Sequence, residues 1–182
     1  MNDTLKTIAT RYSCRKFTGE PIGREQIEAI ALAGVQAPSA MNRQPWKIVV
    51  IQDKSLIEEM DAAVMELLAK QSDTATYDRM VNRGGRLFYN ASCIFLIAME
   101  TGTALDCGIV TENMSLAASS LGLGNVICGM MRMVFDTPDG DKFHEKLIPD
   151  GYEFGMSLLV GYPAEKGYKE PHEPDRTKIV YL

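Results

Sequence analysis

Two arginines and a serine near the start of the chain are the first residues whose types and spacing could do chemistry. They lie in the stretch RYSCRKF, residues 11–17. In an extended segment successive side chains point to opposite faces, so Arg11, Ser13 and Arg15 would share one side. Guanidinium groups make charge-assisted hydrogen bonds to phosphate oxygens, and a serine hydroxyl adds another. The spacing indicates an anion site, and the alternative is an ordinary charged surface strand.

A second basic pair, Arg176 and Lys178, has the same spacing of two and lies in the tail EPHEPDRTKIVYL. Two such pairs suit one phosphate group better than either does alone. Prolines exclude a helix through residues 171–174, whereas the last five residues, KIVYL, have the composition of a strand. A short apolar terminal strand must pair with a sheet edge of its own subunit or of a partner, and the second alternative predicts a dimer.

The stretch APSAMNRQPWKIVVI, residues 37–51, places Ser39, Asn42 and Gln44 in a loop between a helix and a strand. Side-chain amides donate and accept hydrogen bonds together, as is needed to hold polyol hydroxyls or the edge of a heterocycle. Met41 lies in the same loop and is a candidate lining residue of a pocket. The alternative is a well-capped turn that positions Trp46 as a core anchor.

The stretch LGLGNVICGM, residues 121–130, contains GLG but lacks the third glycine of a dinucleotide-binding fingerprint, and it follows a helix instead of a strand. Its glycines at 122, 124 and 129 would still let backbone amides approach a flat ligand closely. A helix stop followed by a small-residue strand explains the same pattern equally well.

Composition limits the function classes. The chain has 182 residues, 46% of them apolar, and 24 acidic against 19 basic residues give a net charge of -5. This predicts a single domain over residues 1–182 without a broad basic face for nucleic acid, so any phosphate partner should be small. The four cysteines lack CxxC spacing, and no stretch reaches the roughly 18 apolar residues of a membrane span. We expect no metal site, no signal peptide or membrane segment, and a cytoplasmic protein with free thiols.

Periodicity and turn signals indicate the elements that position these motifs. Helices are predicted over residues 24–35, 53–70 and 104–122. Strands are predicted over residues 47–51, 93–99, 125–131 and 155–161, the first of them buried. The polar residues 72–86 fit a helix, a mobile lid, or both in turn. Such alternation indicates an α+β or α/β fold.

In order and spacing, the motifs together resemble those of the FMN-dependent nitroreductase family. RYSCRKF is similar to its R-x-S-x-R-x-F motif, APSAMNRQPW to its P-S-x-x-N-x-Q-P-W loop, and LDCGIVTENMSLAASSLGLG to its helix that ends in G-L-G. The resemblance implies an α+β, three-layer fold with a mixed central β-sheet flanked by helices. It also implies a homodimer with the flavin at the interface and the C-terminal strand exchanged into the partner subunit.

The resemblance implies FMN as the cofactor, with Arg11, Ser13 and Arg15 holding its phosphate and ribityl end. Arg176 and Lys178 would close on the phosphate. The other implied contacts hold the ribityl chain and the isoalloxazine ring, and they are the side chains of Ser39, Asn42 and Gln44 and the backbone around Leu123, Gly124, Ile127 and Gly129.

The substrate pocket is where the chain departs from the family pattern. Family loops often carry a second small hydroxyl residue after Ser39, where this chain has Ala40 and Met41, so the pocket over the flavin should be narrower or more apolar. The segment before FYNAS often contributes another basic contact. We take Arg86 for that contact, with Arg83 as the competing candidate.

No nucleophile or acid–base pair is visible, as expected when a flavin carries the chemistry, so no catalytic side chain is assigned. The resemblance predicts a ping-pong reaction in which NADH or NADPH gives a hydride to flavin N5 and leaves. An electrophilic acceptor such as a nitroaromatic, a quinone or an enone then takes the electrons. The alternatives are a flavin-binding or sensing module without turnover, and a specialised enzyme such as a reductive dehalogenase on the same scaffold.

Overall fold

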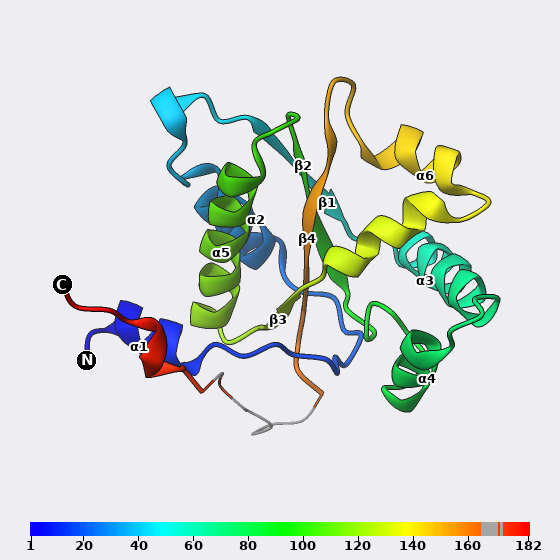
Figure 1. The fold of residues 1–182 in the computed structure, drawn as a ribbon, viewed down its shortest axis with the longest axis horizontal. Helices are drawn as coiled ribbons and strands as arrows, with labels where there is room; N and C mark the ends of the chain where they lie inside the picture. Colours follow the sequence, from blue (N-terminus) through cyan, green and yellow to red (C-terminus); the bar gives the residue numbers. More distant parts are fainter. Residues whose placement is uncertain (165–170, 172) are drawn as a thin grey trace.

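The computed structural model describes residues 1–164, 171 and 173–182. Its centre is a four-stranded sheet in the order β1-β2-β4-β3 (Figure 1). The strands are β1 (Trp46–Ile51), β2 (Cys93–Met99), β3 (Gly124–Ile127) and β4 (Glu153–Gly161). The α-helices are α1 (Asp3–Thr10), α2 (Arg24–Val35), α3 (Lys54–Ala69), α4 (Ala75–Asn82), α5 (Ala104–Ser120) and α6 (Gly140–Leu147). Short 3-10 helices are η1 (Ala40–Asn42), η2 (Gly129–Asp136) and η3 (Arg176–Lys178).

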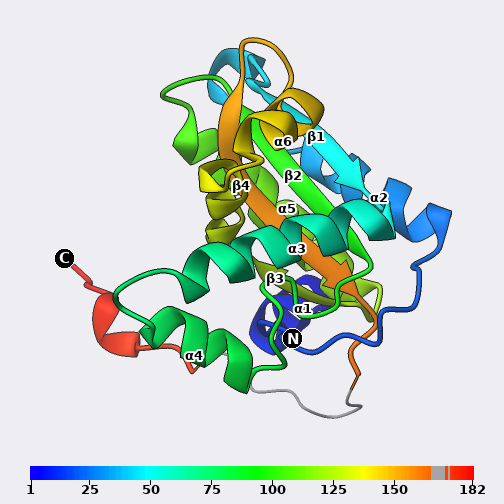
Figure 2. The same ribbon diagram turned by 90° about the vertical axis from the view of Figure 1, so that its right-hand side faces the viewer.

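Helices cover both faces of the sheet, and the alternation of side chains along β2 divides the core in two. Phe95 and Ile97 belong to a buried cluster with residues of α2 and α5. Leu96 lies on the other face of β2 and belongs to a second cluster, with residues of α3, η2 and α6. The predicted α+β fold in three layers is therefore confirmed, and Figures 1 and 2 show the helices on either side.

The expected mixed pairing of the sheet is wrong for these four strands. All three strand pairs are antiparallel. Parallel pairing in the described ranges is limited to an isolated bridge between Ser13 and Asn125. The strand order explains this: β2 and β3 run in the same direction and are joined through α5, but β4 lies between them and runs in the opposite direction.

Two strand predictions need correction. β1 is an edge strand, with Lys47 and Val50 exposed, so the prediction of a buried strand is wrong. β3 ends at Ile127, so the predicted strand over 125–131 is too long. The chain then turns into η2, which buries Met131 and Val134 three residues apart, as the 3-10 repeat requires.

Helix ends follow local chemistry and agree well with prediction. The Asp53 carboxylate accepts hydrogen bonds from the backbone N–H groups of Ser55 (3.0 Å) and Leu56 (3.2 Å) and so begins α3. Beyond the end of α5, Gly122 has φ +76°, the left-handed conformation that glycine adopts without strain. The ambiguous region 72–86 contains α4, followed by a turn at Gly84 and Gly85.

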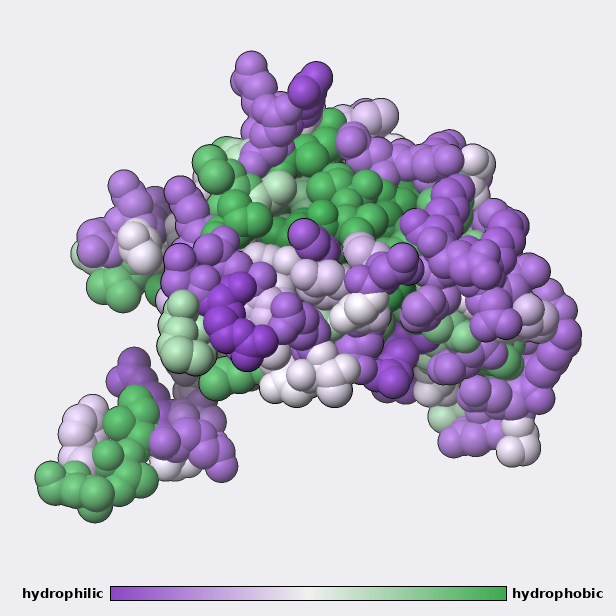
Figure 3. All heavy atoms as spheres, turned by 90° about the horizontal axis from the view of Figure 1, so that it is seen from above, coloured by the Kyte–Doolittle hydropathy of each residue, from purple (hydrophilic) through white to green (hydrophobic). Residues whose placement is uncertain are grey.

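The C-terminal tail differs from the predicted extended strand. Residues 176–178 form η3, and the apolar residues 179–182 are exposed and pair with no strand of the described chain. In Figure 3 this segment forms the separate lobe at the lower left, which ends in hydrophobic residues. Residues 170 and 172 of the predicted tail lie outside the described residues, and its exchange into a partner stays a prediction.

Two further expectations concern the membrane and the cysteines. None of the helices in the described ranges is long and apolar enough to cross a membrane. Cys14, Cys93, Cys107 and Cys128 are all free and buried, as predicted.

Close packing at Gly124 generates a stability prediction. A Cβ atom there would lie 2.7 Å from Cys14 Sγ and 3.2 Å from Phe17 Cε1, so Gly124→Ala should destabilise the protein by about 1–3 kcal/mol. Gly108→Ala in α5 is the matched control, since a Cβ there meets nothing within 4 Å. The control should be about 0.5–1 kcal/mol more stable, because alanine favours helix. Chemical denaturation measures the free energy of unfolding of both variants. Equal free energies for Gly124→Ala and Gly108→Ala would contradict the packing argument.

Candidate anion-binding cleft

A cleft with a volume of about 710 Å³ opens beside the N-terminal segment. One wall is formed by residues 12–17 and the other by residues 82–84, 86, 89 and 90. Its lining includes the cations Arg15, Lys16, Arg83 and Arg86, and no described lining residue carries a carboxylate. In a chain with a net charge of -5, such a concentration of positive charge indicates an anion site.

The N-terminal wall is held in place by its backbone. The N–H of Cys14 donates to the carbonyl of Asn125 (2.8 Å) on β3, and the N–H of Phe17 donates to the carbonyl of Tyr89 (3.1 Å). The side chains of Cys14 and Phe17 are buried, which confirms the packing role predicted for Cys14. Both residues also contribute to the cleft lining, together with Ser13 and Arg15.

The simple alternation expected of RYSCRKF is only partly realised. Tyr12 and Lys16 also line the cleft, although a regular strand would turn them to the opposite face. Arg11 is absent from the lining, and its Nε lies 3.6 Å from Glu112 Oε1 on α5. The physical reason is that residues 11–17 contact the sheet through isolated bridges at Ser13 and Phe17 rather than along a continuous ladder.

Sequence reasoning missed Asn125, the residue on which this wall rests. Its side chain is buried, accepts a hydrogen bond from Ser115 Oγ (2.9 Å), and donates to Ser119 Oγ (2.9 Å). These bonds fix β3 to α5 at the point where Ser13 pairs with it. The sequence feature that could have revealed this role is an asparagine within an apolar strand, because a buried asparagine side chain needs hydrogen-bond partners.

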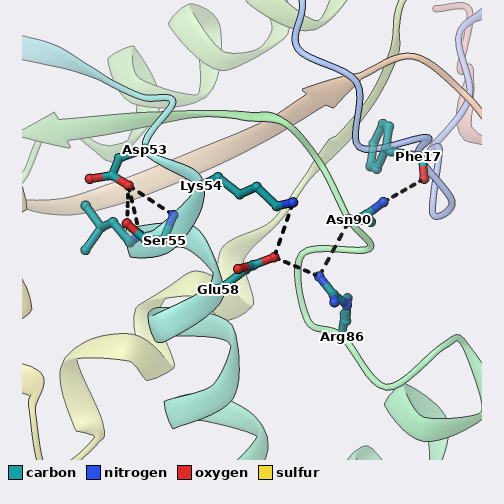
Figure 4. A network of polar contacts seen from close by, with 8 residues as sticks. Phe17, Asp53, Lys54, Ser55, Glu58, Arg86 and Asn90 are labelled. Atoms are coloured by element: carbon teal, nitrogen blue, oxygen red, sulfur yellow. Dashed lines mark hydrogen bonds and ion pairs between the residues drawn. The ribbon is translucent and has the colours of Figure 1, made fainter.

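Arg83 and Arg86 both line the opposite wall. In the described part of the chain, Arg86 has an ion-pair partner and a hydrogen-bond partner (Figure 4). Arg86 Nη1 lies 3.9 Å from Glu58 Oε1 and 3.4 Å from Asn90 Oδ1. Arg83 is exposed and has no ion-pair partner in the described part of the chain.

Burial favours the uncharged forms of Tyr12 and Cys14 in the N-terminal wall. It raises the pKa of Tyr12 to about 12, with a further contribution from Cys14, and it raises the pKa of the Cys14 thiol. At neutral pH Tyr12 is therefore a neutral hydrogen-bond donor, and Cys14 is not a thiolate nucleophile. In the described residues no group of three or more His, Cys, Asp or Glu side chains could hold a metal ion.

The loop with Ser39, Asn42 and Gln44 is a compact hydrogen-bonded unit. Ser39 Oγ accepts from the Gln44 N–H (2.9 Å), and Gln44 Nε2 donates to Asn42 Oδ1 (3.1 Å). An ion pair of 2.7 Å between Arg43 and Glu100 fixes the loop to the end of β2. Met41 projects from this loop with 90% of its surface exposed.

Backbone strain is concentrated in these two regions. In the described ranges the non-glycine residues with positive φ are Met41, Asn42, Gln44, Tyr89 and Asn90. The first three belong to the loop, and the last two line the cleft. Such conformations cost on the order of 1 kcal/mol each or more and tend to persist at functional sites, so both regions are candidates.

A single chain does not bring the loop and the cleft together. Trp46, next to the loop, pairs with Met99 at one end of β2. Ser13 pairs with Asn125, which is opposite Val160, and Val160 is opposite Cys93 at the other end. At about 3.3 Å per residue the length of β2 separates the two regions by roughly 20 Å. Both ribbon views show residues 39–44 and residues 11–17 at opposite ends of the sheet (Figures 1 and 2).

The remaining predicted site residues lie outside the cleft lining. Leu123 and Gly124 are buried where β3 begins, and Gly124 packs directly on Cys14. Ile127 and Gly129 are exposed near the end of β3. Arg176 and Lys178 lie in η3, and Lys178 Nζ is 3.8 Å from Asp175 Oδ2.

Comparison with known proteins identifies the family of the chain. Residues 8–162 match the model of a family described as the Nitroreductase family. A putative NADH dehydrogenase/NAD(P)H nitroreductase from Archaeoglobus fulgidus is 32% identical, with 97% of each chain covered. An FMN reductase using NAD(P)H from Bacillus subtilis is 30% identical, with 96% of this chain and 71% of that protein covered.

A solved structure of a nitroreductase with bound FMN from Desulfitobacterium hafniense is also similar. It superimposes with a TM-score of 0.94 at 43% sequence identity, covering 100% of this chain and 99% of the other.

Proposed function

The chain belongs to the nitroreductase family, and from this premise we propose that it is an FMN-dependent oxidoreductase that uses NADH or NADPH. Its acceptor would be a small electrophile such as a nitroaromatic, a quinone or an enone. The observation that carries the proposal is the cationic cleft without a described carboxylate, beside the R-x-S-x-R segment.

The residues present fit FMN. A volume of about 710 Å³ is within the range of roughly 300–1,000 Å³ that is usual for small-molecule sites. Ser13 and Arg15 supply a hydroxyl and a guanidinium for a phosphate dianion, and Tyr12 and Asn90 supply neutral hydrogen-bonding groups. The four cations in the lining are opposite in sign to the phosphate charge of the ligand, so they would attract it.

The protein has to bind, orient and electrostatically support the cofactor. Bound FMN supplies the hydride chemistry, accepting a hydride from NADH or NADPH at N5 and passing electrons to the acceptor. Ser13 and Arg15 would fix the phosphate, and Arg86 would stabilise negative charge in the cleft. Arg11 would contribute only if it exchanged Glu112 for the ligand.

We propose further that each FMN lies between two copies of the chain in a homodimer. One copy would supply the cleft and the other the loop of Ser39, Asn42 and Gln44, because a single chain holds these regions roughly 20 Å apart. The exposed apolar side chains that would form the interface are Leu5 and Ile8 of α1, Leu32 and Val35 of α2, and Leu105 of α5.

The tail supports the same assembly. Exposed residues 179–182 leave apolar surface that a second copy could cover, and Arg176 and Lys178 would be carried toward the phosphate of the partner's site. Met41, exposed on the loop, would then face the acceptor pocket. Free, buried cysteines suit a reducing compartment, so we place the protein in the cytoplasm, with no nucleic acid or membrane partner.

Anaerobic titration tests the proposed reaction. The purified protein should be yellow, and NADH or NADPH should bleach it with one equivalent per flavin. Addition of a quinone or a nitroaromatic should restore the colour. A yellow protein that neither nucleotide reduces would instead be a flavin-binding module without turnover.

Substitution of Arg15 tests the phosphate site. Arg15→Ala should weaken FMN binding about ten- to a hundredfold, because a charge-assisted hydrogen bond contributes about 1.5–3 kcal/mol. Arg24→Ala is the control, since Arg24 pairs with Glu28 on the exposed side of α2. Flavin fluorescence gives the affinity and circular dichroism the folded state. Full flavin occupancy in Arg15→Ala would remove this assignment.

Mixing two inactive variants tests the shared site. Arg15→Ala and Asn42→Ala should each bind FMN poorly as homodimers. After subunit exchange, random pairing should restore both wild-type halves in about a quarter of the sites. Recovered flavin binding and activity are the readouts. No recovery after verified exchange would mean that both residues act within one chain.

A further inference from the structure

Arg86 is shared between two groups before any ligand arrives. Its Nη1 lies 3.9 Å from Glu58 Oε1 on α3 and 3.4 Å from Asn90 Oδ1 on the cleft wall. Glu58 is not part of the cleft lining, and it contacts the lining through Arg86. Figure 4 shows the chain of contacts from Lys54 through Glu58 and Arg86 to Asn90.

We propose that Glu58 sets the anion affinity of the cleft by competing with the bound ligand for Arg86. This inference rests on the proposed function, since FMN is the anion in question. Glu58 is a positioning residue, and no contact between it and the ligand is required.

Competition follows from the chemistry of the pair. Carboxylate and phosphate oxygens use the same guanidinium donors, so Arg86 must divide those donors between Glu58 and the ligand. The side chains of Arg86 and Glu58 are 46% and 48% exposed, and exposed pairs of this kind are weak enough to exchange.

Lys54 makes this exchange easier. Its Nζ lies 3.9 Å from Glu58 Oε1, one helical turn earlier on α3. When Arg86 turns to the ligand, Glu58 therefore keeps a cationic partner. Lys54 itself lies immediately after the N-cap residue Asp53, whose hydrogen bonds fix the first turn of the helix.

The backbone around Arg86 is fixed, so the exchange involves only its side chain. The buried carboxylate of Asp61 accepts hydrogen bonds from the N–H groups of Leu87 (2.6 Å) and Phe88 (3.3 Å). On the cleft wall, Asn90 Nδ2 donates to the carbonyl of Phe17 (3.4 Å). Arg86 thus extends from a rigid base toward a wall that is joined to the phosphate segment.

The test compares two adjacent charges on α3. Glu58→Gln removes the competitor, whereas Glu59→Gln removes an equal charge that pairs with Lys142 of α6, outside the cleft lining. The full-length protein is stripped of flavin, and the FMN dissociation constant is measured by fluorescence at low ionic strength. Glu58→Gln should bind FMN about two- to fivefold more tightly than wild type, and Glu59→Gln should match wild type.

The sign of the change separates competition from a structural brace. If Glu58 merely held the wall in place, its removal would weaken FMN binding, so unchanged or weaker affinity overturns the inference. Added salt should shrink the difference between Glu58→Gln and wild type, because the pair is exposed.

A double-mutant cycle isolates Arg86 as the intermediary. In an Arg86→Gln background, Glu58→Gln should no longer tighten binding. An equal gain in that background would mean that Glu58 acts through general charge and would overturn the inference. If the wild-type protein binds no FMN, the proposed function fails as well, whereas normal FMN binding without the Glu58 effect removes the inference alone.

Discussion

The length of β2 is the constraint on which the functional arrangement depends. It carries the loop of Ser39, Asn42 and Gln44 at one end and, through β4 and β3, the R-x-S-x-R segment at the other. A fully buried strand of this kind is rigid, so no local adjustment can close a gap of roughly 20 Å. A site that needs both regions would therefore need two chains, which is the basis of the proposed homodimer.

The described lining of the cleft is positively charged, whereas the protein as a whole has a net negative charge. Carboxylates are absent from its described lining, yet Glu58 pairs with the lining residue Arg86, and Glu112 pairs with Arg11, which lies outside the lining. Such second-layer carboxylates lower the cost of gathering cations before a ligand binds. In the proposed competition, the Glu58–Arg86 pair would also make the cleft adjustable, because Arg86 would exchange the carboxylate for a ligand oxygen.

Hydrogen bonds fix the conformation of both the strained loop of Ser39, Asn42 and Gln44 and the walls of the cleft. The left-handed residues Met41, Asn42 and Gln44 are stabilised by hydrogen bonds within their own loop. On the cleft side, Asn125 and Asp61 use buried side chains to fix the backbone of β3 and of residues 87–88. Buried polar groups with satisfied partners specify one arrangement, which an apolar core would leave less defined.

Local features were predictable from the sequence. Helices α3 and α5 and strands β2 and β4 agree closely with their predicted ranges, because periodicity and capping are properties of adjacent residues. The burial of β1 was wrong, since its edge position depends on strand order. The tail was wrong over residues 176–178, where Asp175 begins a 3-10 turn that composition did not reveal.

The sequence by itself predicted a set of site residues, through motifs whose order and spacing resemble the family. It predicted correctly that Ser13 and Arg15 face the same site and that Cys14 is packed in the protein interior. Only the tertiary structure decided that Tyr12 and Lys16 share the cleft, that Arg83 lines it together with the expected Arg86, and that Asn42 lies at the far end of the sheet. The reason is that distances between segments depend on strand order and register, which arise from long-range packing rather than from neighbouring residues.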